Sequence, residues 1–482
     1  MYPLSKQSNK SKIDKLVIAS NRLPVSLTKE DNGNWQLKPS SGGLVTALAP
    51  VLRDMGGLWI GWPGTMEDAN LEDLLKLGSQ NLGYTLKPIT LTAEELSKYY
   101  YGFSNEILWP LFHDLQTHCN FDPSYWNMYK AVNQKFAQVI AEYSTKNNYI
   151  WVNDYHLMLV AEKLRSAGVN RNLGFFLHIP FPPLDIFMKL PWREQVLQAL
   201  LEYDLIGFQT PRDRNNFVYC VESMFRELRF DARRQVSTIM VGKREVRVGT
   251  FPVGIDFEDF AQRSASTDVA KMSQTLRDAA PCCQIMLGMD RLDYSKGIPE
   301  RLRAFGNALE RFSDLRGKIA MFQIVVPSRI DISEYQQLKA EIEGLVSEIN
   351  GRFTRLGWIP IHYMYRHLDR MELLAYYRAA DVALITPLKD GMNLIAKEYC
   401  AANIDESGVL VLSEFAGSAR QLRRNSLLVN PYDIEGVADT IYRAHNMSLD
   451  ERQLRMHRLR NQIAKRDVFW WVNLLLETAT SK

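Results

Sequence analysis

The stretch ADVALITPLKDGMNLIAKE, from Ala380 to Glu398, contains the most informative secondary-structure pattern of this chain. It begins with a short apolar run over residues 380–385, which is typical of a buried parallel strand. Thr386-Pro387 ends the strand, Gly391 marks a turn, and a helix follows. A strand, a glycine turn and a helix in succession predict one βα unit of a parallel sheet with helices on its faces.

Similar apolar runs recur on both sides of this unit. Predicted strands cover residues 15–20, 149–153, 173–178, 205–208, 246–253, 284–288, 318–326, 380–385 and 408–412. Predicted helices cover residues 43–52, 157–166, 333–349 and 449–477, and another begins near residue 212. Because 482 residues are too many for one compact core, we predict two α/β domains that meet at Gly254 across a cleft.

The composition is that of an ordinary soluble protein, with 46% hydrophobic and 23% charged residues. A net charge of +3 is too small to indicate binding to nucleic acid or to an anionic membrane. The five cysteines are odd in number and lack CxxC spacing, which favours reduced thiols and a cytoplasmic location. Residues 1–13 are polar and basic, which predicts a disordered tail and not a signal peptide.

Ligands of open parallel sheets bind at the carboxyl ends of strands, so the polar residues that follow each strand are the candidates for a site. Arg22 follows the first strand and is suited to a phosphate, although a surface salt bridge explains it equally well. Gly42 and Gly43 start a helix, which favours an anion, but a simple turn is the plainer explanation. Asp154 and His178 also follow strands, which favours binding of sugar hydroxyls or proton transfer over a purely structural role.

The run DRLDYSKG, residues 290–297, follows the first strand of the second half. Arg291 and Lys296 are placed there to face a diphosphate, whose charge grows as a nucleoside diphosphate departs. A solvated charged loop is the alternative. Arg329 follows the next strand, and a phosphate clamp formed with Arg22 is one interpretation of it.

The run from Asp390 to Glu398 predicts a helix whose first backbone N–H groups, those of Asn393, Leu394 and Ile395, are free to face a diphosphate. Asp390 is suited to accept bonds from sugar hydroxyls, and Glu398 from ribose hydroxyls. A structural helix cap is the alternative.

Several motifs are absent from the sequence: a GxGxxG fingerprint, a P-loop, an acidic DxD pair, a GxSxG elbow and histidines at metal-ligand spacing. A diphosphate held by Arg291, Lys296 and a helix N-terminus needs no metal. We therefore predict no metal site and no cofactor.

Taken together, the motifs resemble those of the trehalose-6-phosphate synthases from about Leu16 to the C-terminal helix. They are SNRLP at 20–24, SGGL at 41–44, GLWIGWPG at 57–64, YYYGFSN at 99–105, LWP at 108–110, NDYHL at 153–157, FFLHIPFP at 175–182, DRLDYSKG at 290–297, PSR at 327–329 and PLKDGMNLIAKEY at 387–399. The resemblance implies the GT-B fold, with two Rossmann-like domains. It further implies an N-terminal acceptor domain (14–253), a C-terminal nucleotide-sugar domain (254–455) and a last helix (456–482) that returns to the N-terminal domain.

The resemblance also implies a reaction and roles for the matched residues. Glucose would pass from a nucleotide-glucose, UDP-glucose in the first instance, to glucose 6-phosphate, with an α,α-1,1 linkage and retention by front-face attack. The acceptor would be held by Arg22, Trp62, Tyr100, Trp109, Asp154 and Arg329. The donor would be held by Gly42, Gly43, His178, Arg291, Lys296, Leu368, Asp390, Asn393, Leu394, Ile395 and Glu398. Arg291, Lys296, His178 and Asp154 would act in catalysis.

Two departures from the family pattern, Ile330 after the PSR arginine and Leu368 after His367, leave the choice among uridine, guanosine and adenosine open. Glucosylglycerol-phosphate synthesis from glycerol 3-phosphate and a non-catalytic sugar-phosphate sensor remain alternatives. The chain has no DxDx[TV] phosphatase motif, so a separate trehalose-6-phosphate phosphatase would act downstream. Neither nucleic acid nor a membrane is an expected partner, and self-association into a homo-oligomer is left open.

Overall fold

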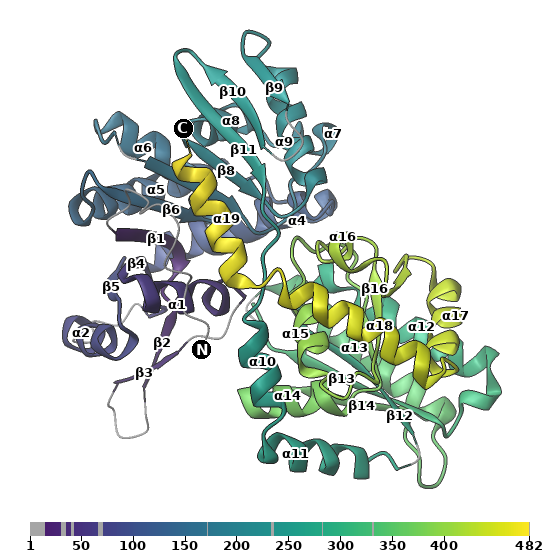
Figure 1. Cartoon of the computed structure of the whole chain (residues 1–482). Helices are drawn as coiled ribbons and strands as arrows, with labels where there is room; N and C mark the ends of the chain where they lie inside the picture. Colours follow the sequence, from purple (N-terminus) through teal and green to yellow (C-terminus); the bar gives the residue numbers. More distant parts are fainter. Residues whose placement is uncertain are drawn as a thin grey trace. The chain divides into compact units, whose positions relative to one another are not determined.

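The computed structural model describes residues 15–29, 35–39, 43–65, 71–170, 172–232, 236–281, 283–329 and 332–481. The chain divides into two compact units (Figure 1). Unit 1 contains the described residues up to Val253 together with those from Phe469 onwards, and unit 2 runs from Gly254 to Val468. The predicted disordered tail (1–13), Gly42 and Ile330 lie outside the described residues.

Unit 1 is built on a nine-stranded sheet. In spatial order its strands are β5 (Thr85–Pro88), β4 (Gly57–Trp62), β1 (Lys15–Arg22), β6 (Asn148–Asn153), β7 (Asn172–Leu177), β8 (Leu205–Phe208), β11 (Arg244–Thr250), β10 (Val236–Val241) and β9 (Arg229–Ala232). The strands from β5 to β11 are parallel, and β10 and β9 extend the sheet in antiparallel fashion. A separate hairpin pairs β2 (Val25–Lys29) with β3 (Trp35–Pro39).

Helices connect the parallel strands of unit 1, as βαβ crossovers require. They are α1 (Gly43–Met55), α2 (Leu71–Leu82), α3 (Ala93–Glu95), the π-helical η1 (Leu96–Leu108), α4 (Trp109–Phe112), η2 (Gln116–His118), α5 (Pro123–Tyr143), η3 (Tyr155–Leu157), α6 (Val160–Ser166), α7 (Leu184–Phe187), α8 (Arg193–Leu200) and α9 (Pro211–Met224). Polar side chains cap several of these helices at the N-terminus. One example is Thr210, whose hydroxyl accepts a bond from the N–H of Asp213 at the start of α9.

Unit 2 contains a six-stranded sheet that is parallel throughout. In spatial order its strands are β14 (Ile361–Tyr365), β13 (Ile319–Val326), β12 (Gln284–Arg291), β15 (Val382–Ile385), β16 (Val409–Ser413) and β17 (Leu427–Val429). Its helices are α10 (Phe257–Ser264), α11 (Thr267–Asp278), η4 (Tyr294–Lys296), α12 (Ile298–Arg311), η5 (Ser313–Leu315), α13 (Ser333–Phe353), α14 (Arg370–Ala379), α15 (Ile395–Ala402), α16 (Ala419–Leu422), α17 (Ile434–His445) and α18 (Leu449–Ala464).

The core of unit 2 is formed by buried apolar side chains that the sheet and the helices around it contribute. Met286 and Val325 come from the sheet, and Phe305, Ile342 and Ile441 come from α12, α13 and α17. Numbered by chain order, the strands of this sheet follow 3-2-1-4-5-6, the order of dinucleotide-binding folds. The strands of unit 1 from β5 to β8 have the same order when they are numbered in the same way, β2 and β3 excepted. The parallel α/β fold class predicted from the sequence is therefore confirmed.

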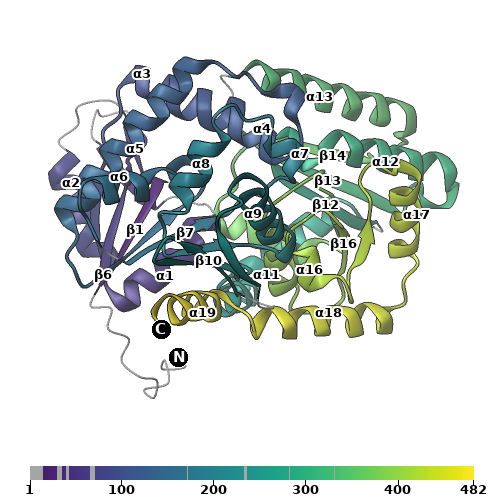
Figure 2. The same ribbon diagram turned by 90° about the horizontal axis from the view of Figure 1, so that it is seen from above.

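The C-terminal segment differs from its prediction in two ways. The predicted helix over residues 449–477 is two helices, α18 and α19 (Val468–Thr480). Unit 2 extends to Val468, so α18 belongs to it and the return to unit 1 begins at Phe469, not at residue 456. Figure 2 shows α18 along the outside of unit 2. The reason for the later return is packing, since α18 contacts α15 and β16 of unit 2.

The last helix, α19, lies across the sheet of unit 1 (Figure 1). Trp471 is fully buried, its ring packs on those of Trp151 and Phe176, and its indole N–H donates to the Phe251 carbonyl over 3.0 Å. The Arg247 guanidinium donates to carbonyls at the C-terminus of the helix, including that of Ala479 at 2.9 Å. Trp471 and Arg247 therefore attach the chain end to the rest of unit 1.

Two further features concern the described residues of both units. Within the described residues, none of the helices combines the length and the apolar character that a membrane span needs. Cys119, Cys220, Cys283 and Cys400 form no disulfide in the part of the chain that the structure describes.

Candidate functional site

In unit 1 the strand order reverses between β1 and β6, the place where open α/β sheets bind ligands at the carboxyl ends of their strands. The sequence places Arg22 at the end of β1 and Asp154 directly after β6. His178 follows β7, the next strand along the sheet. The fold thus gathers three of the predicted site residues at one edge of the unit 1 sheet.

The Arg22 side chain is exposed and lies against aromatic rings. Its guanidinium carbon is 4.5 Å from the ring centroid of Trp62 and 6.0 Å from that of Tyr100. Gly64 has a φ of +93°, and a Cβ at that position would lie 2.9 Å from an Arg22 nitrogen. Among the described residues no carboxylate forms an ion pair with Arg22. The GLWIGWPG motif therefore supplies both the ring and the space for a cation that remains available to a ligand.

Asp154 has a backbone conformation that aspartate rarely adopts, with φ 76° and ψ 167°. Its N–H donates to the Phe176 carbonyl over 2.8 Å, and its Oδ1 accepts a bond from the His178 N–H over 3.2 Å. These two bonds tie the end of β6 to the end of β7. Strain of this kind is retained mostly at functional sites, which supports the choice of Asp154 as a site residue.

The His178 imidazole is only 4% exposed, and its Nε2 lies 3.1 Å from the Asn153 side-chain oxygen. Burial lowers the pKa of His178 to about 3. The ring is therefore neutral near pH 7, which suits a hydrogen bond to a hydroxyl and not a proton-donating role. Trp471 packs at 6.4 Å from the His178 ring centroid, so α19 completes the surroundings of this residue.

The remaining aromatic residues expected at the acceptor lie near this edge in the π-helical segment and α4. Tyr100 is half-buried and stacks on His156, with centroids 5.8 Å apart and planes inclined by 12°. Trp109 is buried and packs at 4.2 Å from His113 and 5.8 Å from Tyr155. Trp109 thus has a largely structural environment, whereas Tyr100 has one face near Arg22.

In unit 2 the strand order reverses between β12 and β15, and the side chains at this edge differ from those of unit 1. Arg291 is the last residue of β12 and is exposed. Directly before it, Asp290 is buried and pairs with Arg301 of α12 over 2.7 Å. Arg301 also donates to the Thr386 hydroxyl over 3.0 Å, which joins the end of β15 to the same network. Burial raises the pKa of Asp290, and the Arg301 charge opposes that rise.

Lys296 and Asp390 face each other at this edge. The Lys296 Nζ lies 2.6 Å from the Asp390 Oδ2, and both side chains are nearly buried. Gly297 allows this arrangement, because its φ is +62° and a Cβ there would lie 2.4 Å from the Thr386 carbonyl oxygen. The two residues were predicted to bind different parts of a donor, and the structure brings them into direct contact.

The helix start at α15 corrects one detail of the sequence prediction. The N–H of Asn393 is not free, since it donates to the Asp390 Oδ1 over 3.1 Å. Asn393 has a φ of 55°, and its side-chain oxygen accepts a bond from the Ala396 N–H over 3.2 Å. Asp390 and Asn393 therefore cap the loop and the helix. The N–H groups of Leu394 and Ile395 lie at the start of α15, where an α-helix leaves its amides without intrahelical partners.

Glu398 lies in the first turn of α15 and is half-buried. Its Oε2 accepts a bond from the Tyr377 hydroxyl over 2.9 Å, and burial raises the pKa of its carboxyl. Leu368 lies in the loop between β14 and α14, half-buried. Sequence reasoning missed Tyr377 and Arg301, because nothing in their local sequence shows that they contact residues far along the chain.

The side chain of Arg329 is more buried in unit 2 than the predicted phosphate clamp with Arg22 implied. Its side chain is 7% exposed, lies 3.6 Å from the Asp293 carboxylate and donates to the Tyr335 hydroxyl. Its φ is 50°, another left-handed conformation. Asp154, Arg329 and Asn393 are three of the five non-glycine residues with positive φ in the described part of the chain. The pairing of Arg329 with Arg22 stays a prediction.

Two other predictions concern the glycine pair at the start of α1 and the absence of a metal. Gly43 is the first residue of α1, and its partner in the predicted pair, Gly42, is outside the described residues. Within the described ranges no cluster of three or more His, Cys, Asp or Glu side chains could hold a metal ion. The expectation that the reaction needs no metal stays a prediction.

Comparison with known proteins identifies the family. Residues 14–481 match the model of glycosyltransferase family 20. A trehalose-6-phosphate synthase of Mycolicibacterium gilvum is 40% identical over 97% of this chain and 93% of its own length. One of Mycobacterium avium is 41% identical over 96% of this chain and 94% of its own length.

Solved structures agree with this relationship. An α,α-trehalose-phosphate synthase (UDP-forming) of Burkholderia xenovorans, in complex with glucose-6-phosphate, has a TM-score of 0.87 and 35% identity, covering 97% of this chain and 100% of its own. An E. coli structure bound with UDP-2-fluoro glucose has a TM-score of 0.86 and 36% identity, covering 97% and 99%. The chain therefore belongs to glycosyltransferase family 20, has the GT-B fold and is related along its whole length to the trehalose-6-phosphate synthases.

Proposed function

We propose that this protein transfers glucose from UDP-glucose to glucose 6-phosphate and forms α,α-trehalose 6-phosphate with retention of configuration. The observation that carries the proposal is a shared feature of the two sheets. Each ends its first strand, at the reversal of strand order, in an exposed arginine: Arg22 in unit 1 and Arg291 in unit 2. Two substrates that each carry phosphate match two such cations.

The acceptor is assigned to unit 1. The Arg22 guanidinium is held against Trp62 and has no carboxylate partner among the described residues, so it is available to a phosphate monoester. Tyr100 adds aromatic surface beside it. The Burkholderia xenovorans relative was solved with glucose-6-phosphate, which supports the same acceptor here.

The donor is assigned to unit 2. Arg291 and Lys296 supply positive charge, and the amides of Leu394 and Ile395 at the start of α15 favour an anion. Glu398 remains as an acceptor for ribose hydroxyls, oriented by Tyr377. The E. coli relative bound with UDP-2-fluoro glucose supports a uridine nucleotide.

Retention is proposed to occur by front-face attack without a protein nucleophile. The bond from the glucose anomeric carbon to the diphosphate oxygen breaks, and the acceptor oxygen bonds to that carbon on the same face. The acceptor proton passes to the departing diphosphate. Asp390 is a poor nucleophile in this structure, because it already accepts bonds from Lys296, Met392 and Asn393.

We extend the proposal to the requirements of the reaction. Arg291 and Lys296 stabilise the departing diphosphate, so the transfer is proposed to proceed without a metal or other cofactor. A cytoplasmic location and a separate phosphatase for the product remain predictions from the sequence.

The test is release of nucleoside diphosphate from UDP-glucose, with glucose 6-phosphate and glycerol 3-phosphate offered separately. We expect release only with glucose 6-phosphate, in buffer with and without EDTA. NMR spectroscopy of the product should show two α-anomeric protons and no reducing end.

Three results would contradict the proposal. Preference for glycerol 3-phosphate would assign the chain to glucosylglycerol-phosphate synthesis. A β-linked product would exclude retention. Failure with UDP-, GDP- and ADP-glucose alike, by a protein that still binds glucose 6-phosphate, would indicate a sugar-phosphate sensor.

A further inference from the structure

A second concentration of positive charge lies in unit 2, in a cavity of about 950 Å³ between α16, the loop that follows it and α18. We call it the arginine groove and define it by Arg420, Arg423, Arg424 and Arg458, with Gln421 and Gln462 between them. The Gln462 side chain donates to the Gln421 carbonyl over 2.6 Å, which joins α18 to α16 at the groove. None of these residues belongs to the predicted donor or acceptor sites.

The four arginines are exposed and lack the partners that neighbouring arginines have. On α18, Arg455 pairs with Glu451 over 2.8 Å and Arg460 pairs with Glu406 over 3.4 Å. Within the described ranges, no acidic side chain pairs with any arginine of the groove. The acidic residues of this unit therefore neutralise the arginines next to the groove and leave those that line it positive.

Four exposed guanidinium groups around one cavity create a local positive potential that attracts anions. Guanidinium groups bind phosphate oxygens through two parallel hydrogen bonds, with better geometry than lysine provides. A volume of about 950 Å³ is within the range of small-molecule sites. Four such groups exceed what one phosphate needs, so a ligand with more than one phosphate fits best.

We propose that the arginine groove binds a small molecule bearing two or more phosphate groups, at a site separate from the substrate sites. The concave shape favours a small ligand over a nucleic acid, and so does the net charge of only +3 on the whole chain. The proposal does not depend on which sugar the enzyme transfers.

The arginine groove is distinct from the candidate donor site. The segment that leads into α16, however, contacts residues of the donor site. The Gly417 N–H donates to the Asp390 carbonyl over 2.8 Å, and the Ser418 N–H donates to the Met392 carbonyl over 2.9 Å. The next residue, Ala419, begins α16, which carries Arg420. A binding test must therefore separate the groove from the cations of the donor site.

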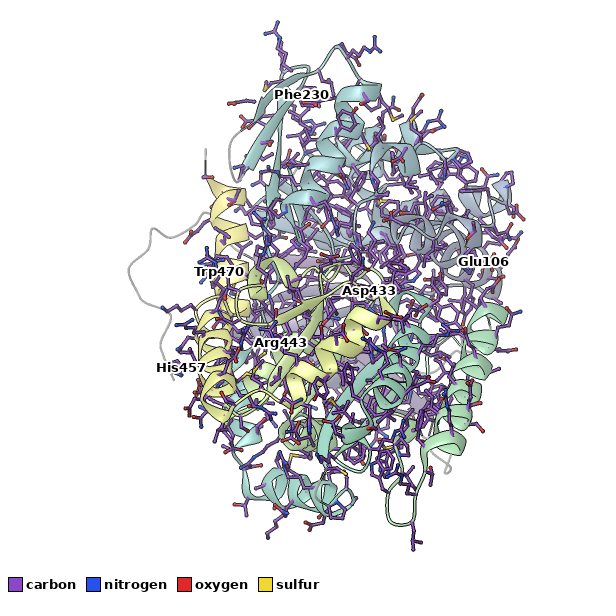
Figure 3. All side chains as sticks on the ribbon, turned by 90° about the vertical axis from the view of Figure 1, so that its right-hand side faces the viewer. Glu106, Phe230, Asp433, Arg443, His457 and Trp470 are labelled. Carbon is purple, nitrogen blue, oxygen red and sulfur yellow. The ribbon has the colours of Figure 1, made fainter. Side chains whose placement is uncertain are left out.

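The experiment measures binding of inorganic pyrophosphate to the full chain by isothermal titration calorimetry. The background protein is Arg22→Gln/Arg291→Gln, which weakens the two substrate phosphate sites. Into it we introduce Arg423→Gln/Arg424→Gln to remove half of the groove charge. The matched control is Arg226→Gln/Arg443→Gln, which removes two exposed arginines elsewhere; Arg443 is labelled on α17 in Figure 3.

We expect saturable binding near one pyrophosphate per chain in the background protein. The groove substitutions should raise Kd by about tenfold or more, the loss expected when charge-assisted hydrogen bonds are removed. The control should change Kd by less than about twofold, as exposed charges at a distance do. Thermal unfolding of each variant checks that the fold is unchanged.

Three results would overturn the proposal. The background protein could show no saturable binding of pyrophosphate. The control pair could weaken binding as much as the groove pair, which would indicate general charge attraction. A single-stranded RNA oligonucleotide could bind the groove more tightly than pyrophosphate and displace it, which would make the groove a nucleic-acid surface.

Discussion

The two units have the same strand order, but the cations at the point where that order reverses have different surroundings. In unit 1, Arg22 is exposed, lies on an aromatic ring and has no carboxylate partner among the described residues. In unit 2, Lys296 and Arg301 are buried or nearly so and are paired with Asp390 and Asp290. One edge thus presents an open cation, while the other presents a charge network behind the exposed Arg291.

The difference has a physical consequence for stability and binding. A buried charge is costly unless it is paired. The pairs of unit 2 therefore matter for the stability of the fold, in addition to any role in binding a ligand. An exposed arginine on an aromatic face contributes little to stability and keeps its hydrogen-bond donors for a ligand. Residues of the same chemical type should therefore respond differently to substitution in the two units.

The largest expected effect is on turnover. Replacing Arg291 with alanine should lower kcat by about 10³-fold, because the charge on the departing diphosphate loses a fixed cation. The free energy of unfolding should change little, since the side chain is exposed. Steady-state kinetics and urea unfolding measure the two effects. The Arg303→Ala variant, from an exposed ion pair on α12, is the control and should retain full turnover. Near-normal turnover by folded Arg291→Ala protein would refute the assigned role.

The buried pair of unit 2 predicts a large effect on stability. Arg301→Met should lower the free energy of unfolding by about 3–5 kcal/mol, because it leaves the Asp290 carboxylate buried without its partner. The double variant Arg301→Met/Asp290→Leu should recover much of that loss. Urea unfolding of both variants is the measurement. A double variant as unstable as the single one would show that the charge pair is not the cause.

The open cation of unit 1 predicts an effect on binding alone. Arg22→Ala should raise the KM for glucose 6-phosphate by about 100-fold, equivalent to about 2.7 kcal/mol, with little change in the donor KM. The free energy of unfolding should fall by less than about 1 kcal/mol, the scale of an exposed cation–π contact. An unchanged acceptor KM would remove Arg22 from the phosphate site and with it the contrast between the units.

The smallest effect concerns pH and tests the neutral state of His178. Its folded pKa of about 3 lies below the ordinary 6.5, so between these values the unfolded chain takes up a proton that the folded chain does not. The neutral His178 ring therefore contributes its full stabilisation above pH 6.5, and this contribution is lost as the pH falls toward 3. At pH 5 the free energy of unfolding should be lower by about 2 kcal/mol. His178→Asn should flatten this slope in unfolding measurements. A slope that His178→Asn leaves unchanged would contradict the neutral state of the buried ring.

Much of the candidate site was predictable because the fold converts chain order into position. Arg22, Asp154, His178 and Arg291 each stand at or directly after a strand, and parallel strands bring such residues to one edge. The contacts of these residues were less predictable. The Asn393 amide that was expected to be free donates to Asp390, and the side chain of Arg329 is nearly buried beside Asp293.

The alternation of strands and helices, the boundary at Gly254 and the strand-end candidates were predictable, because they depend on local spacing and on residue type. Tertiary structure alone decided the pairs Lys296–Asp390 and Arg301–Asp290, the docking of Trp471 near His178 and the gathering of four arginines around one groove. Each of these joins residues from separate elements. Local sequence does not predict such contacts, because the energies of burial and of charge pairing arise only when the chain has packed.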